Sequence, residues 1–320
     1  MKNKNGVMSV KAIIEKITEQ IQEGIYPGAS LALYRKGQWS EHYLGLADPE
    51  KGEPVVADLV YDLASVSKVV GVATICAFLY AKGELALDRP FKELYPRFAH
   101  EKTTIRELLT HTSGLDPFIP NRDQLDARQL KTALENLQLK EDKSFHYTDV
   151  NFLLLGFWLE DRFHQPLDRL FEELIFTPWK MTETRFGPVE KAVPTVRGLT
   201  SGSVHDPKAR VLGCHAGSAG LFSTVSDLER FLEHYLKDDF ARDLSQNFAR
   251  EEGKTRALGW NLEGDWLDHT GYTGTFIMYN RKRQEAVIFL SNRTYEKDER
   301  AQWILDRNSL MDLIKQECEK

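Results

Sequence analysis

Ser65 and Lys68 form the pattern S-x-x-K at the start of an apolar run that extends from Val69 to Leu79. If this run is a helix, the two side chains lie about one turn apart on the same face, so the lysine amine can reach the serine hydroxyl. Ser65 would also lie at the helix N-terminus, where backbone N–H groups and the helix dipole favour developing negative charge. The pattern therefore predicts a serine nucleophile with its activating base. Serine and lysine are common residues, so the prediction depends on what else the chain supplies.

Tyr147 lies in a small polar segment, Y-T-D, that directly precedes another apolar run beginning at Val150. A phenol near cationic amines loses its proton more easily, so Tyr147 is a candidate proton shuttle beside Ser65. The alternative is that Tyr147 only anchors the turn as an aromatic residue.

A third pattern, H-T-G at 269–271, lies just before an expected strand. Glycine lets the backbone approach a substrate closely. The N–H of Tyr272, pointing from an edge strand, could then join the N–H of Ser65 in an oxyanion hole. The alternative is a glycine turn that enters a hairpin.

His111 follows a short helix expected at 104–109 and begins a polar turn that Gly114 closes. A histidine invites a catalytic assignment. We nevertheless expect a structural role, because polar turns of this kind satisfy their own backbone with their side chains.

These residues need a scaffold that brings distant parts of the chain together. Near the two chain ends, strands are expected at 28–34, 39–46, 274–280 and 285–291. The first helix is indicated by an apolar stripe formed by Val10, Ile13, Ile14, Ile17 and Ile21, and the last helix is expected from about 299 to 315. The chain ends are therefore expected to build one antiparallel sheet flanked by helices, with an all-helical lobe inserted between them, in an α+β fold.

The middle of the chain is expected to be mostly helical, with helices at 67–81, 104–109, 129–137, 150–162, 167–175 and 226–236. For the last of these, Ser226 is the expected N-cap and Glu229 lies at the capping-box position. We expect 1–66 and 250–320 to form an α/β lobe and 67–249 a mainly helical lobe, with the active site in a cleft at their junction.

The composition is that of an ordinary soluble globular protein, with 42% hydrophobic and 28% charged residues. A net charge of −6 without a basic block argues against nucleic acid or an anionic membrane as a partner. Cys76, Cys214 and Cys318 are too few and too scattered for a disulfide framework or a zinc site. No run reaches the roughly 18 apolar residues of a membrane span. Residues 1–6 are polar and lack the apolar region of a signal peptide, so a cytoplasmic location is expected.

Together these residues resemble the serine β-lactamase-related hydrolases, the group that contains class C β-lactamases, D-alanyl-D-alanine carboxypeptidases and family VIII esterases. The resemblance covers nearly the whole chain, from about Gly28 to Arg293. Supporting stretches that agree in order and spacing are 108–115 (LLTHTSGL), 175–181 (IFTPWKM), 219–224 (AGLFST) and 290–293 (LSNR).

Three motifs carry the resemblance. S-V-S-K, from Ser65 to Lys68, matches the first motif of the family. Tyr147-Thr148-Asp149 lies where the family has tyrosine, a variable residue and asparagine. His269-Thr270-Gly271 lies where it has lysine-threonine-glycine or histidine-threonine-glycine.

The resemblance implies a β-lactamase/DD-peptidase-like fold and a two-step acyl transfer. Ser65 would attack a carbonyl, with Lys68 and Tyr147 handling its proton jointly, because the acylation base is disputed in S-x-x-K enzymes. The amides of Ser65 and Tyr272 would hold the oxyanion, and water would release the acyl-enzyme. The implied substrate-binding residues are Asp149, His269, Thr270 and Gly271.

Two departures from the family pattern bear on the substrate. His269 replaces the lysine that many β-lactamases place beside the substrate carboxylate, and a neutral imidazole binds a carboxylate less well. Asp149 replaces asparagine, so the site loses an amide donor and gains a negative charge. We hypothesise that Asp149 either pairs with Lys68 or favours substrates bearing an amine, such as D-alanyl groups.

The stretch V-H-D-P at 204–207 is similar to one in family members with esterase or muropeptide-amidase activity. His205 or Asp206 could line the pocket. The alternative is a loop held by its own polar side chains.

The leading hypothesis is a serine hydrolase without metal or other cofactor that acts on small esters or amides, most simply a carboxylesterase. The alternative within enzymes is a peptidoglycan-related D-amino-acid carboxypeptidase, muropeptide amidase or D-alanyl esterase, with β-lactamase activity ranked below these. From another class, the chain could be a non-catalytic muropeptide or β-lactam binding protein, although the intact Ser65, Lys68 and Tyr147 argue against it. The expected partner is a small-molecule ester, amide or muropeptide, and the sequence gives no signal for an oligomeric state.

Overall fold

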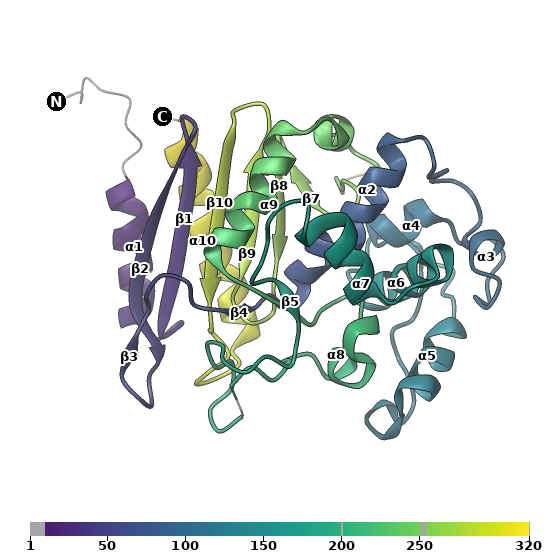
Figure 1. Ribbon diagram of the computed structural model, residues 1–320, viewed down its shortest axis with the longest axis horizontal. Helices are drawn as coiled ribbons and strands as arrows, with labels where there is room; N and C mark the ends of the chain where they lie inside the picture. Colours follow the sequence, from purple (N-terminus) through teal and green to yellow (C-terminus); the bar gives the residue numbers. More distant parts are fainter. Residues whose placement is uncertain (1–9, 200, 251–253, 320) are drawn as a thin grey trace.

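Strands from both ends of the chain form one antiparallel sheet (Figure 1). The structure is a computed structural model that describes residues 10–199, 201–250 and 254–319, so the polar segment 1–6 lies outside the described residues. The strand order is β3-β2-β1-β10-β9-β8-β7. The bounds are β1 (Gly28–Arg35), β2 (Gln38–Asp48), β3 (Glu53–Pro54), β7 (Asn261–Glu263), β8 (Trp266–Thr270), β9 (Phe276–Asn280) and β10 (Glu285–Ser291). β1 pairs with both β2 and β10, so the first and last parts of the chain meet inside the sheet as expected.

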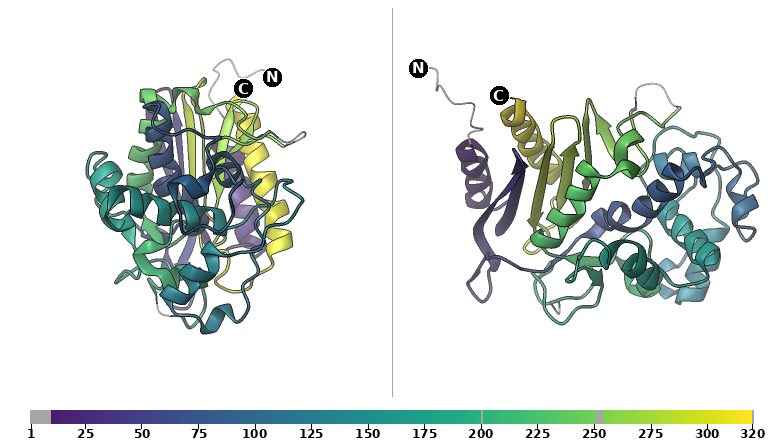
Figure 2. Two further views of the ribbon diagram at one scale, coloured as in Figure 1. Left: turned by 90° about the vertical axis from the view of Figure 1, so that its right-hand side faces the viewer. Right: turned by 45° about the horizontal axis from the view of Figure 1, so that its top comes forward.

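Helices cover both faces of this sheet. α1 (Val10–Gln22) and α10 (Arg300–Glu319) lie on one face, and α9 (Val225–Lys237) lies on the other (Figure 2). Side chains of β1 alternate accordingly: Leu31 packs in the core beside α1 and α10, whereas Ala32 belongs to the larger core. A strand covered on both faces reads as a continuous apolar run because its side chains alternate between two cores. The expected α+β fold class is confirmed.

The helices at the sheet follow the sequence pattern, but some of their bounds differ from the expected ones. α10 extends to Glu319, beyond the expected end at about 315. Ile13 and Ile17 of the expected apolar stripe are buried in α1. α9 begins earlier than expected, because the backbone of Thr224 is extended and its hydroxyl accepts a hydrogen bond from the Asp227 N–H (3.3 Å). Thr224 is therefore the N-cap, and Ser226, the expected cap, already lies within the first turn.

The chain between the two ends is mostly helical, as expected. Its α-helices are α2 (Thr74–Ala81), α3 (Phe91–Leu94), α4 (Ile105–Thr110), α5 (Ala127–Glu135), α6 (Val150–Phe163), α7 (Leu167–Phe171) and α8 (Pro207–Leu212). The division of the chain into lobes at 1–66, 67–249 and 250–320 stays a prediction. α9, from the middle range, packs on the large sheet.

A second, smaller sheet joins a strand just before Ser65 to two strands from the middle of the chain, and it was not expected. Its order is β4-β6-β5, formed by β4 (Tyr61–Asp62), β6 (Leu221–Ser223) and β5 (Arg185–Phe186). Strands of two or three residues are too short to show an alternating pattern. This sheet matters for the site because β4 leads directly to Ser65.

The segment that carries Ser65 and Lys68 is helical but is not the single regular helix expected at 67–81. It begins with a 3-10 turn, η1 (Ala64–Val66), continues as a π-helical segment, η2 (Val69–Ala73), and ends as α2. The Thr74 hydroxyl donates a hydrogen bond to the Val69 carbonyl (2.6 Å) at the point where the π-helical segment joins α2.

This segment also corrects the expectation that no run is long enough to cross a membrane. Ala64–Ala81 meets that test by length and composition, with a mean hydropathy of 1.6, and is the one such helix among the residues that the structure describes. However, 78% of the run is buried inside the protein. A helix that is apolar on all sides fits either a protein core or a membrane, and here it forms the centre of the core.

Candidate active site

Ser65 follows a strained turn. β4 ends at Asp62, and Ala64 adopts a left-handed backbone (φ 45°) immediately before Ser65 within η1. Residues with a Cβ rarely adopt this conformation unless their surroundings hold them there. Here Asp62 Oδ1 accepts a hydrogen bond from the Ala64 N–H (2.8 Å). Because Ser65 lies at the start of a helical turn, its own N–H has no acceptor within that turn.

The Lys68 ammonium contacts the Ser65 hydroxyl directly. Lys68 Nζ lies 2.9 Å from Ser65 Oγ, 2.7 Å from Asp149 Oδ1 and 2.9 Å from the Ser218 carbonyl oxygen. An ammonium has three N–H donors and no acceptor. All three donors of the charged Lys68 are therefore engaged, so in this state it donates to Ser65 and cannot take the hydroxyl proton.

Asp149 is the reason that the fully buried Lys68 stays charged. Burial alone would lower the pKa of Lys68, but the Asp149 carboxylate, with Tyr147, raises that pKa above its ordinary value. Burial would raise the pKa of Asp149, but Lys68 and Lys208 together hold it below its ordinary value. Lys208 Nζ lies 3.3 Å from Asp149 Oδ2. Of the two hypotheses for Asp149, the structure supports pairing with Lys68, and two lysines occupy the carboxylate that a substrate amine would need.

The ring of Tyr147 lies close to Lys68 and to two buried histidines. Lys68 Nζ is 5.2 Å from the centre of the Tyr147 ring. The rings of His111 and His269 are 4.6 Å and 6.1 Å from it, centre to centre. His111 is buried, and its Nδ1 accepts a hydrogen bond from the Thr148 N–H (3.4 Å). His111 therefore packs against Tyr147 and holds the segment that carries it, which agrees with the structural role expected.

His269 is buried and uncharged. Burial, together with the nearby charges of Lys68 and Arg256, holds the pKa of His269 well below its ordinary value. His269 Nδ1 lies 3.1 Å from the Thr270 carbonyl oxygen, which assigns the proton to Nδ1. His269 Nε2 has no hydrogen-bond partner among the described residues. This position therefore offers a substrate a neutral imidazole and no cationic group.

The turn after β8 is fixed against the segment that leads to Ser65. The Thr273 hydroxyl donates to the Asp62 carbonyl (2.9 Å), and the Thr275 hydroxyl donates to the Leu63 carbonyl (3.1 Å). Gly271 permits this approach, because a Cβ at that position would lie only 2.6 Å from the Leu63 carbonyl oxygen. The glycine of the H-T-G pattern is thus needed for close packing.

Tyr272 lies in this turn and not in an edge strand as expected, because β8 ends at Thr270. The Tyr272 carbonyl accepts a hydrogen bond from Arg293 Nε (2.8 Å), and the Tyr272 hydroxyl donates to Asp298. These contacts fix the Tyr272 side chain and backbone from two sides.

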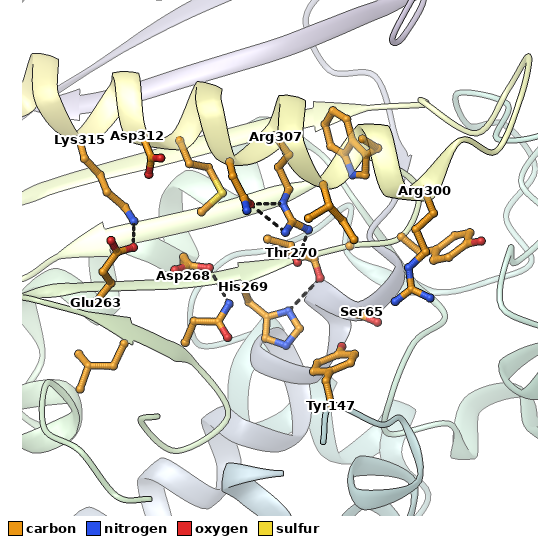
Figure 3. A pocket seen from close by; sticks show the side chains of 18 of the residues that line it. Ser65, Tyr147, Glu263, Asp268, His269, Thr270, Arg300, Arg307, Asp312 and Lys315 are labelled. Atoms are coloured by element: carbon orange, nitrogen blue, oxygen red, sulfur yellow. Dashed lines mark hydrogen bonds and ion pairs between the residues drawn. The ribbon is translucent and has the colours of Figure 1, made fainter. Parts of the chain in front are cut away.

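Two cavities meet at Ser65. One, of about 670 Å³, extends between α10 and strands β7 and β8, from Ser65 and Tyr147 at one end to Glu263 and Lys315 at the other (Figure 3). The second, of about 580 Å³, lies on the side of Asp149 and α8. The residues that line both cavities are Ser65, Tyr147, Tyr272 and Arg300. A substrate carbonyl placed at Ser65 could therefore extend one end into each cavity.

Comparison with models of known protein families shows to which family the chain belongs. A family model described as Beta-lactamase matches residues 13–310, which is most of the chain. The chain belongs to the β-lactamase family. It is therefore a serine hydrolase, and the resemblance seen in the sequence motifs is confirmed.

Relatives and solved structures agree with this assignment. A protein of Escherichia coli O157:H7, provisionally named D-alanyl-D-alanine carboxypeptidase, is 28% identical over 356 residues, covering 87% of this chain and 81% of that protein. A β-lactamase/D-alanine carboxypeptidase from Pseudomonas syringae has a TM-score of 0.72 at 19% identity, covering 94% of this chain and 98% of the other. EstCE1, a hydrolase with promiscuous acyltransferase activity, has a TM-score of 0.74 at 19% identity, covering 95% and 98%. The solved structures confirm the β-lactamase/DD-peptidase-like fold.

In this β-lactamase-family protein, the V-H-D-P stretch forms the start of α8. Asp206 is the N-cap and accepts a hydrogen bond from the Ala209 N–H (2.8 Å). The His205 N–H donates to Asp62 Oδ2 (2.7 Å). His205 and Asp206 also line the 580 Å³ cavity. Both alternatives for this stretch thus hold at once: its side chains order the loop and also face the cavity.

Lys208 and Arg307 are charged residues of the site that the sequence did not single out. Lys208 pairs with Asp149, and Arg307 Nη1 donates to the Thr270 hydroxyl (3.1 Å). A lysine or arginine on a helix is most often a solvated residue, so neither carried a signal of its own. The Asp-Pro helix start directly before Lys208 was an available signal, because it fixes the direction of the first turn of α8.

Among the residues that the structure describes, no group of three or more His, Cys, Asp or Glu side chains is placed to hold a metal ion. Cys76 and Cys214 are free thiols, and Cys76 and Cys318 are buried.

Proposed function

We propose that this β-lactamase-family hydrolase cleaves small esters or amides through an acyl-enzyme on Ser65. The observation that carries the proposal is the contact between Lys68 Nζ and Ser65 Oγ (2.9 Å) at the junction of the two cavities. A serine hydroxyl is a weak nucleophile unless a neighbouring group accepts its proton as the new bond forms. Lys68 and Tyr147 are the titratable groups placed for that role.

Lys68 and Tyr147 handle the proton jointly in this proposal. Ser65 Oγ bonds to the carbonyl carbon while its proton passes to the Lys68–Tyr147 pair, once that pair has lost a proton. The pair then gives the proton to the leaving alcohol or amine as the bond between that group and the carbonyl carbon breaks. Water next adds to the acyl-enzyme carbonyl and gives a proton to the pair, which returns it to Ser65 Oγ as the acyl bond breaks. Because Lys68 is charged in the resting site, the pair must first lose a proton, so we expect acylation to become faster as the pH rises.

The N–H groups of Ser65 and Tyr272 are the proposed donors to the oxyanion. Two features support this. Ser65 lies in the first turn of its helical segment, and the hydroxyls of Thr273 and Thr275 fix the turn of Tyr272 against the segment before Ser65. Donors that are already in place stabilise the charge that develops in the transition state, and each typically contributes about 10²–10³-fold in rate.

A substrate panel tests the proposal and its alternatives. Nitrophenyl esters, nitrocefin, D-alanyl peptides and muramyl peptides would be incubated with the wild-type protein and with Ser65→Ala. We expect the wild type, but not Ser65→Ala, to hydrolyse nitrophenyl esters. We expect the wild type to hydrolyse nitrocefin slowly, because the uncharged His269 binds a substrate carboxylate less well than a lysine would. If wild type and Ser65→Ala are equally inactive on every substrate but the wild type binds muramyl peptides or nitrocefin, a non-catalytic binding protein is supported instead.

The cytoplasmic location stays a prediction.

A D-amino-acid carboxypeptidase is the second candidate, and Arg307 is the observation that favours it. Arg307 reaches the Thr270 hydroxyl from α10 and lines the 670 Å³ cavity (Figure 3). The guanidinium suits a substrate carboxylate at a position where His269 supplies no charge. The E. coli relative carries a carboxypeptidase name, which supports the same alternative.

Replacing Arg307 separates the two candidates. For a carboxypeptidase, Arg307→Met lowers kcat/KM for a D-alanyl-D-alanine peptide by at least tenfold and leaves a neutral nitrophenyl ester nearly unaffected. Loss of both activities in equal measure would argue that Arg307 only holds the fold of the site. No release of D-alanine by the wild type would leave the esterase as the supported function.

A further inference from the structure

Asp149 bridges two lysines that come from different elements. Its Oδ1 lies 2.7 Å from Lys68 Nζ and its Oδ2 lies 3.3 Å from Lys208 Nζ. The side chain of Lys208 is only 15% exposed, and that of Lys68 is 0% exposed. A single carboxylate thus lies between two largely buried ammonium groups, one of which contacts the nucleophile.

The position of Lys208 is fixed by the local structure. Asp206 caps α8, and Pro207 occupies its first turn, so the direction of this helix start is set. The neighbouring His205 N–H donates to Asp62, the same carboxylate that holds the Ala64 N–H in the turn before Ser65. Lys208 is therefore tied through one hydrogen-bonded frame to the segment that presents the nucleophile.

Other titratable groups also face Lys68, and of these Tyr147 adds to the rise of the Lys68 pKa that Asp149 causes. Tyr147 faces it from the segment before α6, His111 from the end of α4 and His269 from β8. Burial holds the pKa of both histidines well below the ordinary value, so they are uncharged. Arg122, Arg210, Asp206, Asp298 and Arg300 line the cavity on the Asp149 side. The carboxylate in direct contact with Lys68 is that of Asp149.

We propose that Lys208 is a positioning residue for the reaction, which acts through Asp149 to limit how firmly Lys68 holds its proton. If Asp149 paired with Lys68 alone, its full charge would stabilise the ammonium and oppose loss of the proton. Lys208 compensates part of that charge and adds a positive charge nearby, and both effects favour neutral Lys68. The same contact holds the carboxylate in place. This inference rests on the proposed function, because it concerns the proton that Ser65 must lose.

The test compares pH profiles of kcat/KM for a nitrophenyl ester. Lys208→Met removes the second cation, so the rising limb moves to higher pH by about one unit or more. Near neutral pH this corresponds to a loss of activity of about tenfold. Lys208→Arg keeps the charge and returns the limb toward its wild-type position. Lys237→Met is the control, because it removes a cation that pairs with Glu233 on α9 and lines neither cavity; its limb stays in place.

Two outcomes would overturn the inference. One is a Lys208→Met profile that falls by the same factor at every pH, and the other is a limb that stays at the wild-type position. In the Asp149→Asn background, Lys208→Met should move the limb less than it does in the wild type, and an undiminished shift would contradict action through Asp149. If Lys208→Met fails to fold by circular dichroism, Lys208→Gln provides the same comparison. Failure of the proposed function is distinguishable, because the wild type itself would then show no activity that depends on Ser65.

Discussion

At the scale of single residues, Asp149 determines the charge of the group beside the nucleophile. Lys68 is fully buried, and burial without a partner favours the neutral amine. The carboxylate at 2.7 Å reverses that preference. An asparagine at this position would leave the lysine with an amide dipole in place of a charge, so the departure from the family pattern alters the proton chemistry of the site.

Removing this carboxylate should destabilise the protein strongly. Asp149→Ala leaves Lys68 and Lys208 without their shared partner, and breaking a buried ion pair on one side typically costs about 3–5 kcal/mol. Asp149→Asn retains a hydrogen-bond acceptor and should cost less. Urea unfolding followed by circular dichroism measures both. If Asp149→Ala were as stable as the wild type, the ion pair would not hold Lys68 as described.

The ion pair of Asp149 with the two lysines should also make the stability of the protein depend on pH in the acid range. The pKa of Asp149 lies below its ordinary value of 3.8 in the folded protein, because Lys68 and Lys208 outweigh the effect of burial. The ion pair therefore stabilises the protein above about pH 3.8. This stabilisation is lost as the pH falls further, through the lower pKa that Asp149 has in the folded protein. Asp149→Asn should show a shallower loss of unfolding free energy over that acid range in a series of urea titrations. Identical slopes for the two proteins would contradict the direction of the shift.

Residue types and spacing could predict the first groups of the site but not their partners. Ser65, Lys68, Tyr147, Asp149 and the H-T-G pattern stand out because each occurs in a short, ordered motif. Lys208 did not, because its role depends on a contact between α8 and a residue far away in the sequence. Pairing of this kind is a property of the folded chain and leaves no local pattern.

At the scale of elements, the approach of β8 to the turn before Ser65 depends on one glycine. Gly271→Ala would place a Cβ 2.6 Å from the Leu63 carbonyl oxygen, so β8 and the turn of Tyr272 must move away from Ser65. A displacement of about 1 Å in an active site can cost about 10²-fold in rate. We expect that loss in kcat/KM for a nitrophenyl ester.

A glycine far from the site supplies the control for this substitution. Gly24→Ala introduces a methyl group where nothing lies within 4 Å, although its left-handed backbone (φ 73°) makes alanine unfavourable. It should lower stability by about 1 kcal/mol and leave kcat/KM unchanged. Full activity of Gly271→Ala would show that the close approach of β8 does not position the oxyanion donors.

The elements themselves were predictable where they are long and regular. Each strand of the two hairpins and most of the helices has an apolar pattern of its own, and the antiparallel sheet follows from them. The strands β3, β7 and β8 of the large sheet, the small β4-β6-β5 sheet and the η1–η2 irregularity were missed. Strands of two or three residues and a change from 3-10 to π-helical turns depend on contacts with distant residues, such as the bond of the Leu221 N–H to Ser67 Oγ (3.1 Å).

At the scale of the whole molecule, the large sheet separates two apolar cores. The smaller core contains α1, α10 and one face of the strands, and the larger core contains the other face and the helices of the middle of the chain. The active site lies next to the larger core, and Trp303 and Met311 of the smaller core also line its 670 Å³ cavity. Residues of α1 line neither cavity, so changes in the smaller core under α1 should lower stability more than activity.

Ile17 tests that separation. Ile17→Ala empties a fully buried position in the core under α1 and should lower the unfolding free energy by about 2–5 kcal/mol. Ile14→Ala is the matched control, because Ile14 lies on the same helix but is only partly buried. This change should lower the unfolding free energy clearly less. Both variants should keep the wild-type kcat/KM at temperatures where they remain folded. A large loss of kcat/KM in folded Ile17→Ala would mean that the smaller core is coupled to the site.

The central claim is that Ser65 is a nucleophile activated within the folded protein. Its most direct test is the intact mass of the protein after incubation with a fluorophosphonate probe, followed by mapping of the labelled peptide. We predict one adduct per wild-type chain, located at Ser65, slower labelling of Lys68→Met and no adduct on Ser65→Ala. An unlabelled wild-type protein, or equal labelling of wild type and Ser65→Ala, would contradict the claim.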